Sequence, residues 1–195
     1  MQRIDWAHTA VVGVHWQHEV VSPDGVFGPF LADQVARHGV AANAARVAAA
    51  ARAAGGLVIF TRVAYRPGYP DLIANAPSFV MIRERGAFLE GDPKTRIVED
   101  VARQPGDVVV TSTRLGGFSG TDLDLVLRGR GVRTVVFTGV ATNLAVTATA
   151  YQAVDNGYRI VTVSDACTAA TDELHDTYLS TLGQLGEVVA TGEIA

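Results

Sequence analysis

Side chains that could do chemistry follow the ends of two predicted strands in the first part of the chain. His15 lies at the end of the valine-rich run 9–16, and an imidazole, which titrates near neutral pH, can act as a general acid or base. Arg62 and Tyr65 lie in the stretch 61–71 among further arginines and tyrosines. Arginine beside tyrosine can bind a carboxylate and stack on a ring. The alternative for His15 is a strand-end histidine bonded to backbone, and the alternative for the stretch 61–71 is a solvated loop with a Pro-Gly turn.

Strand and helix patterns alternate along the chain. Short runs rich in valine and other β-branched residues predict strands. An alanine-dense segment that stops at two glycines, and three later segments with capping residues or a closing glycine, predict helices. The predicted strands are 9–16, 57–63, 107–111, 134–138, 159–163 and 187–191, and the predicted helices are 40–54, 121–127, 143–156 and 171–185.

This alternation predicts an α/β fold with a parallel sheet and helices on both of its faces. In such sheets ligands bind beyond the C-terminal ends of the strands, so the site is expected among the residues that follow each strand. The whole chain, 1–195, is expected to form a single domain. Segment 64–104 has several prolines and glycines and no clear periodicity. Because it is long for a strand-to-helix connection, it is predicted to be a lid-like insertion.

Composition argues against several classes of protein. The chain has 195 residues, of which 48% are hydrophobic and 18% charged, as is typical of a globular domain. Its 16 basic and 20 acidic residues give a net charge of −4, which argues against nucleic-acid and membrane-surface partners. No apolar run approaches the ~20 residues that span a bilayer, and segment 1–10 lacks the apolar stretch of a signal peptide. We therefore expect a cytoplasmic protein with a small-molecule substrate or ligand.

Three motifs carry a resemblance to a known family. They are Gly-Gly-Phe-Ser-Gly-Thr-Asp-Leu-Asp at 116–124, Gly-Val-Ala-Thr-Asn at 139–143 and Ser-Asp-Ala at 164–166. Together with Gln17 after the first strand, they resemble the isochorismatase-like hydrolase superfamily in order and spacing over nearly the whole chain. The resemblance implies a three-layer α/β/α fold with a six-stranded, mostly parallel sheet in the order 3-2-1-4-5-6.

The usual chemistry of that family is hydrolysis of amides by a cysteine. An Asp ends the first strand, a Lys follows the third, and the Cys lies in the first turn of the helix after Gly-Val-Ala-Thr-Asn. At the matching places this sequence has His15, Ser112 and Ala145. Because Ala145 has no nucleophilic atom, the chain is predicted to lack the Asp-Lys-Cys triad and to form no thioester there. The single cysteine, Cys167, follows the fifth strand and is expected to be a buried structural thiol.

No metal and no cofactor are expected. The nicotinamidase branch of the family has an Asp-x-His metal motif after strand two, where this chain has Val63 and Tyr65. No other group of His, Asp and Glu has the spacing of metal ligands. The chain resembles isochorismatase itself in lacking the cysteine, and that enzyme hydrolyses a vinyl ether without a thioester, although it keeps the Asp as an acid.

The resemblance places His15 and Ser112 at two positions that lie close together in the family. A histidine beside a serine could form a base and nucleophile pair, and His15 alone could act as a general acid or base. The family also has a cis peptide at the position of Val140–Ala141. The N–H groups of Ala141 and Ala145 could then stabilise an oxyanion.

The alternative for Gly-Val-Ala-Thr-Asn is a plain strand-to-helix turn capped by Thr142 or Asn143. Arg114 reaches either the pocket or the surface, and Phe118 is either pocket wall or core. Gln17 is expected to tie the first loop by side-chain hydrogen bonds, and Glu19 to be exposed. The candidate substrate-binding residues are Gln17, Arg62, Tyr65, Arg114, Phe118, Ala141 and Asn143.

Two functions stay open. One is a hydrolase without a catalytic cysteine, acting on a small anionic or aromatic metabolite through His15 and Ser112. The other is a non-catalytic pseudoenzyme of the same fold that binds a small ligand or a partner protein. Polar residues at two triad positions favour the enzyme, and loss of the whole triad favours the binder. By resemblance, the chain is expected to form a homo-oligomer, either a dimer or a tetramer.

Overall fold

The sheet is the centre of the computed structural model, which describes residues 4–194. Within these residues six strands run in the order β3-β2-β1-β4-β5-β6, and every neighbouring pair is parallel. The predicted fold class and strand order are therefore confirmed. The strands are β1 (Thr9–Val14), β2 (Leu57–Val63), β3 (Val108–Ser112), β4 (Thr134–Val140), β5 (Arg159–Thr168) and β6 (Glu187–Val189).

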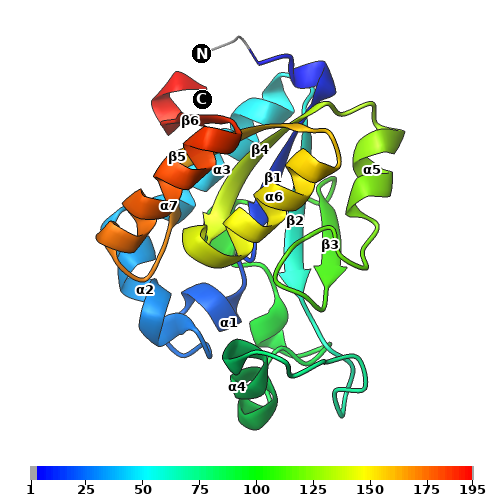
Figure 1. Ribbon diagram of the computed structural model, residues 1–195, viewed down its shortest axis with the longest axis vertical. Coiled ribbons are helices and arrows are strands. Elements are labelled where there is room, and N and C mark those ends of the chain that lie inside the picture. The colour runs from blue at the N-terminus through cyan, green and yellow to red at the C-terminus, as the bar shows by residue number, and fades with distance from the viewer. Residues whose placement is uncertain (1–3, 195) are drawn as a thin grey trace.

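Helices cover both faces of the sheet. In Figure 1, α6 and α7 lie in front of the strands, α5 lies beside β3, and α3 lies behind the strands; residues of α5 share the core layer of α6 and α7. Two more helices, α1 and α4, lie beyond the arrowheads of the strands, on the side where their C-terminal ends meet. The helices are α1 (His18–Val21), α2 (Gly28–Arg37), α3 (Val40–Ala53), α4 (Pro77–Arg85), α5 (Leu123–Gly129), α6 (Thr147–Asp155) and α7 (Asp172–Leu185).

Alternating side chains of each strand feed two separate core layers. Val11 of β1 belongs to the layer that α2 and α3 complete, whereas its neighbour Val12 belongs to the layer under α5, α6 and α7. This follows from the two-residue period of a strand. The helix residues that face the sheet are often alanines, such as Ala48 of α3 and Ala150 of α6, whose small side chains let helix and sheet approach closely.

The structure adds helices that the sequence patterns did not indicate. These are α1, α2 and α4, and α4 lies within the irregular segment 64–104. The predicted helix 143–156 begins with a π-helical turn at Thr142–Val146 before α6. Strand β5 runs past its predicted end because the pairing with β4 shifts register between Phe137 and Gly139 and then continues.

The chain builds the sheet outward from β1 first toward one edge and then, starting with β4, toward the other edge. Strands β2 and β3 lie on one side of β1, whereas β5 and β6 lie on the far side of β4. Val14 pairs with Gly139 in this central ladder, so the residues just after the two strands lie side by side. In open α/β sheets such a switch point is where ligands bind.

Candidate functional site

A cavity of about 80 Å³ lies at the switch point. Its walls come from the ends of β1 and β4, from the loop after β3 and from α1, α2 and α4. Twelve of the fifteen residues that line it are apolar, and the three polar ones are His15, Ser78 and Arg114. The lining residues are His15, Val20, Phe27, Leu31, Val63, Ser78, Phe79, Ile82, Phe88, Arg114, Leu115, Val140, Ala141, Leu144 and Ala145.

His15 is the titratable group in the floor of this cavity. Its backbone N–H donates to the Thr61 carbonyl (3.1 Å) and its carbonyl accepts from the N–H of Gln17 (2.8 Å), with φ at 53°. Only 6% of the residue is exposed, and Nε2 has no hydrogen-bond partner among the described residues. Burial lowers the pKa of His15 to about 4, because the interior disfavours the charged imidazolium. The ring is therefore neutral at pH 7.

Ala141 and Ala145 face His15 from the end of β4 and the turn that follows. The Val140–Ala141 peptide is cis, as the family resemblance implies. The π-helical turn is fixed from outside the cavity by Thr142, whose Oγ1 lies 2.8 Å from Nδ1 of His175 on α7. At Ala145 the side chain is a methyl group, so this wall of the cavity presents no nucleophile.

Thr142 and Asn143 do not cap the turn, because neither side chain bonds to its backbone N–H groups in residues 4–194. His175 lies far from the other site residues along the chain, and its sequence context did not indicate this contact with Thr142.

Ser112 organises the loop that carries Arg114. Its Oγ donates to the Arg114 carbonyl (3.1 Å) and accepts from the Arg114 N–H (2.9 Å). Ser112 does not line the cavity, and no hydrogen bond joins it to His15 within the described part of the chain. The structure therefore does not bring together the expected base and nucleophile pair. Arg114 does reach the cavity, and its guanidinium makes one hydrogen bond, to the Thr113 carbonyl (3.2 Å).

Gln17 is fully buried, and its side-chain amide forms hydrogen bonds with backbone groups. Its Nε2 donates to the carbonyls of Val63 and Thr95 (both 2.8 Å), and its Oε1 accepts from the Val63 N–H (2.7 Å). Both amide hydrogens are used, and Gln17 does not line the cavity. The expectation that it ties the first loop agrees with these contacts, whereas the expectation that it contacts substrate finds no support in them.

Arg62, Tyr65, Phe118 and Asn143 also lie outside the cavity lining. Arg62 bonds to Thr111 Oγ1 across the β2–β3 edge (2.9 Å). Tyr65 is buried and donates its hydroxyl to the Thr113 carbonyl (3.1 Å), and desolvation raises its pKa to about 12. Phe118 packs against a tyrosine ring under α5 and α6, on the other side of the sheet from α4. Arg62, Tyr65 and Phe118 thus have structural partners in the fold.

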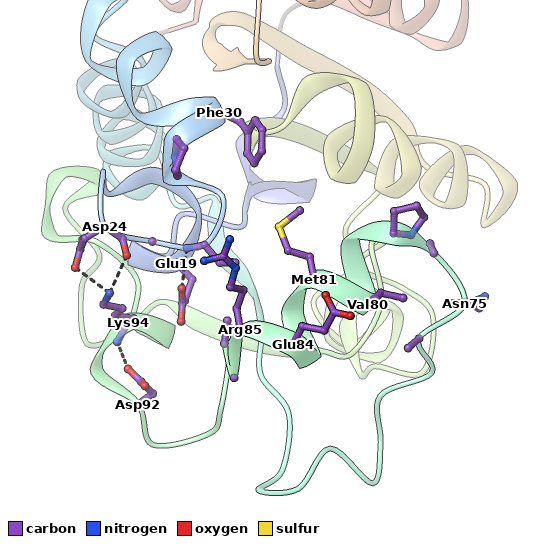
Figure 2. Close-up of a pocket in the computed structure, with 18 residues that line it drawn as sticks. Glu19, Asp24, Phe30, Asn75, Val80, Met81, Glu84, Arg85, Asp92 and Lys94 are labelled. Carbon is purple, nitrogen blue, oxygen red and sulfur yellow. Dashed lines mark hydrogen bonds and ion pairs between the residues drawn. The ribbon is translucent and has the colours of Figure 1, made fainter.

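Glu19 was expected to be exposed, and this is wrong. It is 5% exposed and its carboxylate accepts from the backbone N–H groups of Val26 (3.0 Å) and Phe88 (3.3 Å). Glu19 also borders a wide groove between α2 and α4, shown in Figure 2, where Phe30 and Met81 extend from its two sides. The short helix α1 turns Glu19 inward, and the sequence patterns did not indicate that helix.

The two backbone bonds of Glu19 hold aromatic residues of the cavity. The Phe88 N–H is one of the two donors, and Phe27 directly follows the other donor, Val26. The rings of Phe27 and Phe88 lie 5.9 Å apart, tilted by 47°, and both line the cavity. Glu19 therefore fixes one wall of the cavity without touching its interior.

Cys167 lies in β5 beside Gly139 of β4. It is 2% exposed, and burial raises the pKa of its thiol to about 12. Its Sγ lies 3.8 Å from the Phe137 carbonyl, and the residue does not line the cavity. Such a thiol is in its unreactive, protonated form at neutral pH.

In residues 4–194 no three His, Cys, Asp or Glu side chains gather closely enough to hold a metal ion. Among the helices described, none combines the length and the apolar character that crossing a membrane requires.

The fold and the position of the cavity define a class of α/β protein with its site at the sheet switch point. A family model described as the isochorismatase domain matches residues 9–194. The chain belongs to the isochorismatase family.

Its relatives in this family include hydrolases. The ureidoacrylate amidohydrolase RutB of Variovorax paradoxus is 37% identical over 170 residues, which cover 81% of this chain and 68% of that protein. The structure of a cysteine hydrolase from Pseudomonas syringae pv. phaseolicola is similar with a TM-score of 0.89 and 26% identity, covering 100% of this chain and 96% of the other. The N-carbamoylsarcosine amidase of Thermoplasma acidophilum is similar with a TM-score of 0.77 and 26% identity, covering 95% and 98%.

Proposed function

We propose that the chain is a small-molecule hydrolase that works without a cysteine nucleophile, with His15 as its general acid and base. The observation that carries the proposal is the orphaned Nε2 of His15 in a cavity shared with Ala145 and Arg114. A buried nitrogen without a partner costs free energy, and backbone outliers such as the φ of His15 cluster at active sites. The amidohydrolases among the relatives support an amide as the bond that is cleaved.

In the proposed reaction a water molecule occupies the place of the missing thiol beside Ala145. Neutral His15 accepts a proton from this water as the water oxygen attacks the carbonyl carbon of the substrate. The electron pair of the carbonyl moves onto its oxygen, where the N–H groups of Ala141 and Ala145 stabilise it. When the oxyanion collapses, the bond to the leaving group breaks and His15 returns the proton to that group.

Arg114 is proposed to bind an anionic group of the substrate. With its pKa near 4, His15 by itself is a weak base. A substrate carboxylate beside Arg114 brings negative charge close to the imidazole, which favours the imidazolium and raises the pKa of His15 toward neutrality. Substrate binding and base strength would thus be coupled.

Three further residues or segments have supporting roles in this proposal. Ser112 positions Arg114 through its two bonds to that residue and is not the nucleophile. Segment 64–104 acts as a lid, since α4 and the stretch after it supply Phe79, Ile82 and Phe88 to the cavity. The chain forms a homo-oligomer, for which half-exposed Leu144 and Tyr151 near and on α6 offer apolar contact area.

The alternative is a pseudoenzyme that binds a small ligand and does not transform it. The observation that favours it is the nature of the cavity wall, in which apolar side chains outnumber polar ones and a methyl group stands at Ala145. A binding site tolerates such a wall, whereas hydrolysis needs water beside His15.

A hydrolysis assay separates the two functions. Short amides, esters and vinyl ethers are incubated with the wild-type protein and with two variants, and products are followed by proton NMR. We expect turnover by the wild type, a loss of about 10²–10⁴-fold in His15→Gln, and unchanged turnover in Cys167→Ala. Loss of activity in a folded Cys167→Ala protein would overturn the cysteine-free mechanism. Saturable binding without any turnover would support the pseudoenzyme.

A further inference from the structure

The volume of the cavity limits what can occupy it. An engineered protein cavity of about 150 Å³, lined by aliphatic and phenylalanine side chains, accommodates one benzene molecule. The cavity at His15 has about 80 Å³, roughly half of that. A six-membered aromatic ring therefore exceeds this volume, whereas a branched group of about three carbons, half the size of benzene, matches it.

The wall that sets this volume is held in place. Phe27 and Phe88 contact each other, with ring centroids 5.9 Å apart. The backbone N–H of Phe88 and that of Val26, the neighbour of Phe27, are both bound by the buried carboxylate of Glu19. Phe88 itself is 1% exposed. Because backbone and rings are both fixed, the cavity cannot widen at this side by a simple side-chain rotation.

The polar groups in the cavity add a charge requirement. Arg114 is the charged residue of the lining, and apart from its bond to the Thr113 carbonyl its guanidinium hydrogens have no partner among the described residues. A guanidinium binds a carboxylate through paired hydrogen bonds. The buried Nε2 of His15, also without a partner, points to a polar atom of the same ligand.

We infer that the cavity selects a small carboxylate with a branched aliphatic body over an aromatic one, and that Phe27 and Phe88 set the size limit. The inference rests on the proposed function in one respect, that this cavity is the substrate site. It narrows the expected substrate class from an anionic or aromatic metabolite to a short aliphatic acid derivative. Each additional carbon that the wall buries is expected to strengthen binding about fourfold until the cavity is full.

Isothermal titration calorimetry with isobutyrate and benzoate tests the inference, because the two probes share one charge and differ in size. For the wild-type protein we expect isobutyrate to bind about tenfold more tightly than benzoate or better. In Phe88→Leu, and independently in Phe27→Leu should the first variant not fold, the preference should fall about tenfold because the ring has space. Phe118→Leu is the matched control: the same change outside the cavity should leave the preference unaltered.

Arg114→Met should weaken both carboxylates about tenfold or more. Benzoate binding as tightly as isobutyrate in the wild type overturns the inference, and so does the absence of isobutyrate binding. A preference that survives both phenylalanine variants overturns the assignment of the size limit. Since the titration needs no turnover, a protein that fails the hydrolysis assay can still show the aliphatic preference, and a hydrolase can lack it.

Discussion

Replacing Glu19 by Gln tests whether a buried carboxylate holds the cavity wall. The side chain keeps its shape but loses one acceptor, because the amide NH₂ group now faces a backbone N–H. In the native protein the carboxylate accepts from Val26 (3.0 Å) and from Phe88 (3.3 Å). After the substitution, one of these two N–H groups has no acceptor in an interior where Glu19 is 5% exposed.

The magnitude follows from those two bonds. A hydrogen bond to a charged acceptor contributes about 1.5–3 kcal/mol, and a buried donor left without a partner costs about 1–3 kcal/mol. The two contributions overlap, since they describe the same N–H group, so the free energy of unfolding should fall by about 2–4 kcal/mol. For a domain of this size, that corresponds to a decrease in melting temperature of about 4–16 °C.

Urea unfolding followed by circular dichroism at pH 7 measures this loss. Glu84→Gln is the matched control, because Glu84 lines the same groove (Figure 2) but is exposed, and it should change stability by about 0.5 kcal/mol or less. Titration with isobutyrate should also show weaker binding to Glu19→Gln than to the control. A loss of stability no larger than that of the control would refute the role given to Glu19.

Three further predictions concern buried polar groups. The pKa of His15 falls from 6.5 to about 4 on folding. As the pH drops between these two values, the His15 imidazole is protonated in the unfolded chain but stays neutral in the folded one. The free energy of unfolding should decline over that pH range by up to roughly 3 kcal/mol. Urea titrations at pH 7 and 4.5 should show that His15→Gln lacks this part of the decline. If the variant has the same pH dependence as the wild type, the prediction is wrong. Because burial raises the pKa of Cys167 to about 12, iodoacetamide should label the native thiol roughly 100-fold more slowly than the urea-unfolded thiol at pH 8. Equal labelling rates would show that the native protein has an accessible thiolate. Gln17→Leu removes the side-chain partners of the Val63 N–H, the Val63 carbonyl and the Thr95 carbonyl. Chemical denaturation should therefore show a free energy of unfolding lower by about 3 kcal/mol or more. A decrease below about 1 kcal/mol would contradict the structure.

The layers of the fold could be predicted because strand signals here are local. Buried parallel strands such as β2 (Leu57–Val63) open on a continuous apolar run, here residues 57–60, and α3 is an alanine-rich segment that glycine ends. By contrast, α1 has four residues and α4 nine, with mixed polarity. Short helices of this kind depend on packing against distant parts of the chain and not on their own periodicity.

The candidate site could be predicted in part, because parallel strands bring the residues that follow them to one edge. That rule placed His15, Arg114, Ala141 and Ala145 near one another, and all four line the cavity. It could not decide which way a side chain points. Phe118 turns under α5 and α6 instead. The phenylalanines of the apolar wall, Phe27, Phe79 and Phe88, lie in segments without any readable pattern, so the sequence did not indicate them.

The contacts of Gln17 also divide segment 64–104 into two parts that should differ in amide hydrogen exchange. Besides the bond from Gln17 to Thr95, the Val98 N–H donates to the Trp16 carbonyl (2.8 Å) and the His18 N–H to the Arg96 carbonyl (3.2 Å). These hydrogen bonds attach the end of the segment, residues 95–98, to the first loop after β1. Within residues 4–194 no backbone bond joins α4 to the sheet. Amides such as that of Val98 should therefore exchange only when the whole domain unfolds, whereas those of α4 exchange through local opening. A ligand would then enter past α4, while the far end of the same segment stays closed.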